Sequence, residues 1–272
     1  MARILVAGLG YVGLPLAEAL VQEGHQVFGL KRKPYQSSSI QVLCFDATNS
    51  ESLVLPEVDE VVFCMAPKSR DLEIYKSCYV DATKNIIAAL PGKTPAMYFV
   101  SSTAVYSQDQ GEWVDESMAD SPEPNNRSGI LRAAEEHVLA ATDDSYALRF
   151  GGIYGPGRTR LIQKLANGDV PLSAKPYYTN RIHRDDCVAA IQHLQHERPA
   201  SGTYNAVDDD PADRNDMIRW AQSELGSPVQ EKTENQGQMN KRVSNKKLKA
   251  SGFKFQYSSF KDAYKEILEG LD

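Results

Sequence analysis

Three glycines near the start of the chain are spaced as a phosphate-binding turn requires. Gly8, Gly10 and Gly13 follow a short apolar run at residues 4–7 and precede apolar residues at helical spacing. The first glycine permits a tight turn, the second lets the backbone approach a pyrophosphate, and the third lets the helix pack closely on the strand. The amino end of that helix also offers N–H groups and a positive dipole to phosphate. We therefore expect this turn to bind a dinucleotide, rather than to be a glycine turn without a ligand.

The second expected strand, at residues 26–30, is followed by basic residues where an acid is common. In NAD-binding sites, a carboxylate about 20 residues beyond the glycines accepts a hydrogen bond from the ribose 2′-hydroxyl. This chain places Lys31 and Arg32 there, and no acidic residue occurs between Glu23 and Asp46. Because cationic side chains pair with a 2′-phosphate, the expected cofactor is NADP(H), with NAD the less favoured dinucleotide. The alternative is an exposed basic loop.

Strand and helix patterns alternate through the first half of the chain. Further strands are expected at residues 40–45, 61–65, 97–101 and 146–150. A long apolar stripe at residues 72–90 predicts one of the intervening helices. This alternation predicts an α/β fold with parallel units in a doubly wound Rossmann sheet. Asp46, after the third strand, would then accept from the adenine amino group or serve as a turn residue.

The alternation loosens after residue 150. Glycine and proline cluster at residues 151–157, which predicts a loop, and two later strands are expected at residues 180–183 and 203–207. We expect a Rossmann domain at residues 1–155, to which the chain returns at about 181–208. A small C-terminal α/β substrate lobe would comprise residues 156–180 and 209–272.

Composition restricts the classes of protein to which the chain can belong. Its 272 residues, 42% of them hydrophobic, are enough for one large domain or for a domain with a smaller lobe. The net charge of −6 and the lack of a basic stripe argue against nucleic acid as a partner. No apolar run reaches the roughly 18 residues of a membrane span, and no signal peptide is evident, so we expect a cytoplasmic protein without a membrane partner. The four cysteines lack metal-ligand spacing, and no metal is expected.

Several later segments carry a family resemblance. They include Val-Ser-Ser-Thr-Ala-Val-Tyr at 100–106, Val-Asp-Glu at 114–116, Leu-Arg-Phe-Gly-Gly-Ile-Tyr-Gly-Pro-Gly-Arg at 148–158, Asn-Arg-Ile-His-Arg-Asp-Asp at 180–186 and Tyr-Asn at 204–205. With the glycine turn, they resemble the extended short-chain dehydrogenase/reductases, the NAD(P)-dependent epimerase/dehydratase family, from Ile4 to about Leu268. The two-residue spacing of the first glycines is similar to that of an atypical, YeeZ-type subgroup.

The resemblance implies a set of cofactor contacts around the glycine turn and the ends of the strands. These are Gly8, Gly10, Tyr11, Val12, Gly13, Lys31, Arg32, Asp46, Met65, Ala66, Ser101, Arg132 and Phe150. It also implies a small-molecule substrate and makes a homodimer a candidate assembly.

The family's catalytic residues are a Ser or Thr after the fifth strand and a Tyr-x-x-x-Lys pair on the next helix. Ser102 matches the first position, and Thr103 follows it. Alignment on Glu136, which matches a later glutamate of the family, puts Ser128 at the tyrosine position and Arg132 at the lysine position. A serine hydroxyl is too weakly acidic to donate a proton near neutral pH, and an arginine that binds the ribose cannot give up its proton.

Four side chains in other segments of the resemblance are candidate substrate contacts: Tyr106, Arg158, Arg181 and His183. Arginine suits a phosphate or carboxylate, and in relatives the ligand is often a nucleotide-sugar pyrophosphate. The alternatives are packing for the tyrosine, a structural role for the histidine and surface ion pairs for the arginines.

We expect an NADP-dependent oxidoreductase or epimerase-like enzyme acting on a small polar substrate, with nucleotide sugars among the candidates. The alternative is a non-catalytic NADP(H)-binding sensor or scaffold.

Overall fold

The computed structural model describes residues 1–49, 53–121, 125–175, 177–228 and 240–269. Its main feature is a seven-stranded sheet with the strand order β10-β7-β5-β4-β1-β2-β3. The strands are β1 (Arg3–Ala7), β2 (Gln26–Lys31), β3 (Gln41–Cys44), β4 (Glu60–Phe63), β5 (Ala96–Ser102), β7 (Ser145–Phe150) and β10 (Gly202–Ala206). β1 pairs in parallel with β2 and β4, β2 with β3, and β4 with β5. The predicted doubly wound Rossmann sheet is confirmed.

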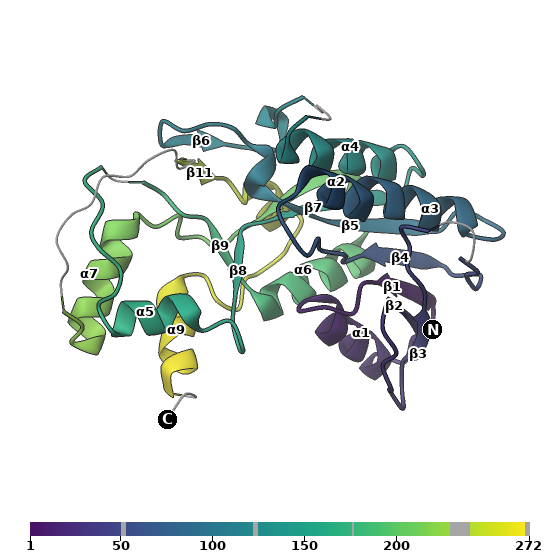
Figure 1. Ribbon diagram of the computed structural model, residues 1–272, viewed down its shortest axis with the longest axis horizontal. Coiled ribbons are helices and arrows are strands. Elements are labelled where there is room, and N and C mark those ends of the chain that lie inside the picture. The colour runs from purple at the N-terminus through teal and green to yellow at the C-terminus, as the bar shows by residue number, and fades with distance from the viewer. Residues whose placement is uncertain (50–52, 122–124, 176, 229–239, 270–272) are drawn as a thin grey trace. The chain divides into compact units, whose positions relative to one another are not determined.

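Helices cover both faces of this sheet. They are α1 (Gly13–Gln22), α2 (Leu72–Lys76), α3 (Ala82–Ala89), α4 (Arg127–Leu139) and α6 (Arg184–Glu197). α2, α3 and α4 lie on one face, and α1 and α6 lie on the other (Figure 1). Because both faces are covered, Ile4, Leu5 and Val6 of β1 are all buried, and the strand is a continuous apolar run. Among the described residues, no helix has the length and apolar character needed to cross a membrane.

The segment expected as one long helix contains a change of helical type. α2 is capped by the Asp71 carboxylate, which accepts from the N–H groups of Glu73 and Ile74. A π-helical turn, η1 (Ser77–Asp81), then joins α2 to α3. The apolar stripe predicts the helical segment correctly, but a single wider turn alters spacing too little to be visible in the sequence.

The strand order reverses direction at β1. β2 and β3 lie on one side of β1, and β4 and β5 lie on the other. The segments that leave the carboxyl ends of β1 and β4 therefore diverge, and in open α/β sheets ligands bind in the crevice at such a switch point. The glycine turn begins at the end of β1, so the sheet topology puts it at this ligand-binding edge.

The chain divides into two compact units. The first contains residues 1–105, 119–149 and 188–204, and the second contains residues 106–118, 150–187 and 205–272. The elements of the second unit are β6 (Glu112–Val114), β8 (Gly152–Tyr154), α5 (Arg160–Ala166), β9 (Arg181–His183), α7 (Arg214–Leu225), β11 (Lys241–Val243), α8 (Lys246–Ala250) and α9 (Phe260–Glu269). Its core is formed by apolar and aromatic side chains of α5, α7 and α9, with Tyr154.

The pairing of strands in the second unit differs from the sequence expectation. Residues 151–157, expected as a loop, contain β8, which pairs in parallel with β9 in a separate two-stranded sheet. Of the stretch expected to return to the large sheet, β10 does so and β9 does not. β6 likewise pairs with β11, far along the chain. Strands of three residues have no periodicity that identifies their partner, so only the tertiary structure assigns them to a sheet.

Candidate functional site

The glycine turn after β1 has the geometry that a pyrophosphate site requires. Gly8 has a φ of +105°, and a Cβ there would lie 2.8 Å from the carbonyl oxygen of Cys64. A Cβ on Gly13 would lie 2.0 Å from the Gly8 carbonyl oxygen. At Gly10, by contrast, no described heavy atom lies within 4 Å of the Cβ position. The first and third glycines are therefore required by the fold, while the second leaves space through which a ligand can approach the backbone.

The amino end of α1 adds an attractive electrostatic environment for an anion. Val12 is the N-cap residue, and its side chain cannot accept a hydrogen bond from the first turn. The first turn of a helix has N–H groups without intrahelical acceptors and carries the positive end of the helix dipole. Met65 and Ala66 follow β4, which pairs with β1, and both remain partly or largely exposed. These features keep the expected phosphate-binding edge open to a ligand.

The end of β2 carries the expected basic pair. Lys31 is the last residue of the strand, and its Nζ lies 4.4 Å from the ring centroid of Tyr35. Arg32 is exposed, and its carbonyl oxygen lies 3.6 Å from the Cys44 sulfur. The structure thus places two cationic residues at the carboxyl end of β2, and one of them, Arg32, is exposed.

Asp46 lies within the electrostatic influence of this basic region. Its Oδ1 accepts from the Thr48 N–H at 3.1 Å and from the Thr48 hydroxyl at 2.8 Å. Burial raises the pKa of Asp46, but the Thr48 bonds and the positive charges of Arg32 and Lys68 outweigh it, so the pKa lies below its ordinary value. Asp46 is therefore a turn residue in the structure, and a contact with adenine stays a prediction. Lys68, which sequence reasoning missed, adds a third cation near the same carboxylate.

Ser102, the expected catalytic serine, is the last residue of β5. Its Oγ accepts from the N–H of Ala104 at 3.2 Å and so caps a short 3₁₀ turn that begins at Thr103. This bond uses an acceptor lone pair and leaves the hydroxyl proton available to donate. The side chain is half-buried. Ser102 therefore has a fixed position at the carboxyl edge of the sheet and a proton that can point toward a substrate oxygen.

A buried charge network lies beneath this serine. The carboxylate of Glu135 on α4 accepts from the Ser101 hydroxyl, and Arg149 of β7 donates to it from Nε at 2.9 Å and Nη2 at 2.8 Å. Both Glu135 and Arg149 are almost completely buried. Arg132 donates to the same carboxylate from the helix surface. The network joins β5, β7 and α4, and it holds the strand end that carries Ser102 against the helix.

The comparisons with known proteins identify the family. A model of the NAD dependent epimerase/dehydratase family matches residues 4–206. The chain belongs to this family. Protein YeeZ from Escherichia coli (strain K12) is 28% identical over 220 residues, covering 75% of this chain and 77% of YeeZ.

Solved structures support the same assignment. A Methylobacillus flagellatus protein, provisionally assigned as an NAD-dependent epimerase/dehydratase, is 34% identical with a TM-score of 0.81 over 99% of this chain and 98% of that chain. MoeE5 in complex with UDP-glucuronic acid and NAD has a TM-score of 0.79 at 21% identity over 98% of both chains, which shows a shared fold. The predicted resemblance to the epimerase/dehydratase family and its YeeZ-type members is confirmed.

The amino end of α4 departs from the family's catalytic pair. The Ser128 hydroxyl lies 3.4 Å from Asp120 Oδ2. Arg132 donates to the Asp120 carbonyl at 3.2 Å and to Glu136 at 3.1 Å, in addition to its bond with Glu135. The guanidinium at the expected lysine position is therefore engaged by two carboxylates of its own helix, and its contact with a cofactor ribose stays a prediction.

The difference in burial between two glutamates of α4 indicates a second way to align this helix with the family. Glu135 is completely buried, whereas the side chain of Glu136 is 49% exposed. Alignment of the family's glutamate on Glu135 would put Arg127 and Leu131 at the tyrosine and lysine positions. Neither alignment provides a tyrosine or a lysine, so the absence of the family's usual proton-transfer pair from this chain stays a prediction.

Two predicted substrate contacts in the second unit have different surroundings. Tyr106 is completely buried, and its hydroxyl donates to Asn205 Oδ1 at 2.6 Å. Arg158 is exposed, and its Nη1 lies 3.3 Å from the Ile153 carbonyl oxygen. Phe150, predicted as a cofactor contact, is also buried. Of these three residues, Arg158 alone is exposed.

Arg181 and His183 are both buried on β9. Arg181 donates to Thr179 and to the Met217 sulfur, and its guanidinium carbon lies 5.3 Å from the Phe260 ring centroid. The ring of His183 packs on Tyr257 with centroids 4.0 Å apart. Burial lowers the pKa of His183, which favours the neutral imidazole, although the Asp185 carboxylate partly opposes this shift. Both side chains have protein partners, and their predicted contacts with substrate stay predictions.

Proposed function

We propose that the chain is an NADP(H)-dependent oxidoreductase or epimerase that acts on a small polar substrate. The observation that carries the cofactor preference is the basic end of β2. Lys31 and Arg32 occupy the region where NAD-binding sites usually hold a carboxylate. Lys68 adds positive charge near Asp46. A 2′-phosphate would be attracted to these cations, and a ribose hydroxyl alone would gain much less.

The residues of the first unit divide the work of binding and catalysis. The glycine turn and the amino end of α1 would hold the pyrophosphate, because a Cβ at Gly10 would meet open space and the helix end attracts anions. The bound nicotinamide would supply hydride transfer at its C4 atom. Ser102 would donate its hydroxyl proton in a hydrogen bond to the reacting oxygen. Arg132 would stay charged throughout and would contribute electrostatic attraction, not proton transfer.

A nucleotide sugar is the leading candidate substrate. MoeE5, which shares the fold, was solved with UDP-glucuronic acid. In this chain, Arg158 is an exposed arginine in the segment that follows β7, and its Nη1 contacts the Ile153 carbonyl oxygen. A guanidinium recognises a phosphate through two parallel hydrogen bonds, so a sugar diphosphate offers it a suitable partner.

A second candidate function is NADP(H) binding without turnover. It is favoured by α4, which supplies Ser128 and Arg132, or Arg127 and Leu131, in place of the family's tyrosine and lysine. None of these four side chains donates a proton readily near neutral pH. A chain that senses the reduced or oxidised cofactor would need the glycine turn and the basic pair, and it would not need a proton donor.

Binding and turnover measurements on the full chain separate these functions. Calorimetric titration should give tighter binding of NADPH than of NADH. The chain with bound NADP⁺ or NADPH should then be incubated with a panel of sugar nucleotides, with nicotinamide absorbance and product chromatography as readouts. Conversion of one substrate supports the enzyme. Tight NADPH binding with no conversion across the panel favours the sensor, and equal affinity for the two dinucleotides contradicts the NADP preference.

A further inference from the structure

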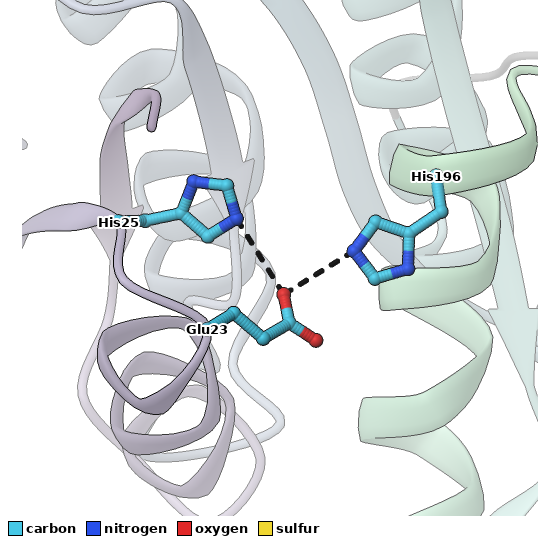
Figure 2. A group of neighbouring side chains, drawn as sticks. All are labelled: Glu23, His25 and His196. Carbon is cyan, nitrogen blue, oxygen red and sulfur yellow. Dashed lines mark hydrogen bonds and ion pairs between the residues drawn. The ribbon is translucent and has the colours of Figure 1, made fainter.

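A cluster of two histidines and one glutamate lies at the opposite end of α1 from the glycine turn. Figure 2 shows the imidazole rings of His25 and His196 pointing toward the carboxylate of Glu23. The His196 Nε2 lies 3.2 Å from Glu23 Oε2, and the His25 Nε2 lies 3.5 Å from the same oxygen. The three potential ligand atoms all lie within 4.8 Å of one another. Glu23 and His196 are 173 positions apart, so no sequence spacing indicates this cluster.

Two helix ends meet at the cluster. Glu23 is the C-cap residue of α1, and His196 lies in the last turn of α6. Carbonyl groups at the carboxyl end of a helix carry the negative end of its dipole, which stabilises a nearby cation. Because the carboxyl ends of α1 and α6 both lie at the cluster, their dipoles and the Glu23 carboxylate together favour a cation there.

The second oxygen of the carboxylate is held from outside the cluster. Gln192, one turn before His196 on α6, donates from Nε2 to Glu23 Oε1 at 2.7 Å. Metal-binding carboxylates are commonly oriented by such a hydrogen bond to the oxygen that does not face the ion. Glu23 Oε2 is thereby directed to the two imidazoles.

We propose that Glu23, His25 and His196 bind a zinc-type divalent cation, with Glu23 Oε2 and the two Nε2 atoms as ligands and water in the fourth position. Ligand atoms about 2.0–2.1 Å from a tetrahedral ion lie roughly 3.3 Å from one another. The two distances to Glu23 Oε2 agree with this value. The side chain of His196 is 52% exposed, so it can rotate to bring the two imidazole nitrogens closer. Two imidazole ligands favour zinc over magnesium or calcium, which prefer oxygen.

Binding requires both imidazoles to change tautomer. In the metal-free cluster both Nε2 atoms face Glu23 Oε2, a carboxylate oxygen that only accepts hydrogen bonds, so each neutral ring carries its proton on Nε2. In His25 the N–H of Ala2 also donates to Nδ1 at 3.1 Å, which favours the same tautomer. Coordination needs the Nε2 lone pairs, so each Nε2 proton leaves to solvent and a proton is taken up at Nδ1 of the same ring. The Ala2 N–H must then turn to water. The ion replaces this bond with a link between the end of α1 and the end of α6, and so we expect it to stabilise the first unit by mass action.

The test uses the full chain after treatment with a chelator. Calorimetry with zinc chloride should give one bound zinc per chain, and zinc should raise the melting temperature, while magnesium or calcium chloride should not. The variant His196→Gln should lose both effects and keep its circular dichroism spectrum, because the side chain is largely exposed. His193→Gln, on the same helix but outside the cluster, should retain both effects.

Three results would overturn the proposal. The first is the absence of saturable zinc binding by the wild-type chain. The second is undiminished zinc binding by His196→Gln, which would place the ion elsewhere. The third is loss of zinc binding in both His196→Gln and the control His193→Gln, which would show that the loss is not specific to a ligand of this cluster. None of these results depends on NADP(H) binding or turnover.

Discussion

The glycine turn after β1 and the amino end of α4 belong to the same compact unit, yet they differ in how they relate to the family. The turn keeps the full geometry for a dinucleotide: two glycines that the fold requires and one that leaves open space. The start of α4 keeps the helix and its buried Glu135, but it has neither the tyrosine nor the lysine of the family. Cofactor binding depends mainly on backbone shape in the first region, whereas proton transfer depends on side-chain identity in the second.

This difference indicates that binding and chemistry can separate within one fold. A dinucleotide site built from N–H groups and a helix dipole survives many side-chain changes. A proton donor is lost by a single substitution, since no neighbouring group of suitable pKa replaces it automatically. The predictions that follow test whether the two regions are as independent as this comparison suggests.

The largest effect is expected in the glycine turn itself. Gly10→Val should abolish measurable NADPH binding and leave the melting temperature nearly unchanged. The valine side chain would occupy the space through which the pyrophosphate approaches, and no described protein atom lies within 4 Å of its Cβ position. Calorimetry and thermal unfolding measure the two effects. Glu18→Val, at an exposed position of the α1 helix that follows the turn, should bind NADPH normally. Normal binding by Gly10→Val would mean that the turn has only a structural role.

A large loss of stability is expected when the buried charge network of Glu135 and Arg149 is disrupted. Glu135→Gln should lower the free energy of unfolding by about 3–5 kcal/mol, because Arg149 would remain buried without its carboxylate. Glu136→Gln, whose side chain is half-exposed, should cost no more than about 1 kcal/mol. Urea unfolding compares the variants, and similar losses in both would show that the buried pair has no special role.

The catalytic roles of two serines sharpen the comparison once a substrate is known. Ser102→Ala should lower kcat by about 100-fold, a typical loss for one hydrogen bond to the reacting oxygen. Ser128→Ala should leave turnover within a small factor of wild type, because its hydroxyl is too weakly acidic to transfer the proton. Loss of turnover in Ser128→Ala with intact NADPH binding would show that the start of α4 takes part in catalysis after all.

The smallest of these effects concerns cofactor preference. The double variant Lys31→Asp with Arg32→Ala should bind NADPH roughly 10- to 100-fold more weakly, since a hydrogen bond to a charged group contributes about 1.5–3 kcal/mol. Its affinity for NADH should change little, and the neighbouring variant Lys33→Ala should bind both dinucleotides like the wild type. Calorimetry would contradict the assignment if the double variant lost affinity for NADPH and NADH equally.

The alternating pattern of the first half was sufficient to predict most of the large sheet. The buried runs that form β1, β2, β4, β5 and β7 were located to within one or two residues, because parallel strands covered on both faces are continuously apolar. The short strands β8 and β9 were not assigned to their own sheet, because their pairing is set by neighbours distant in sequence.

By itself, the sequence determined that a glycine turn follows the first strand, that basic residues follow the second, and that α4 has no tyrosine-lysine pair. Each is a property of residue type and local spacing. Only the tertiary structure decided that Glu135, and not Glu136, is buried against Arg149. It alone placed Lys68 near Asp46 and brought His196 to Glu23 and His25. These three groupings join side chains from different elements of the chain, and such contacts exist only after the sheet and its helices have packed together.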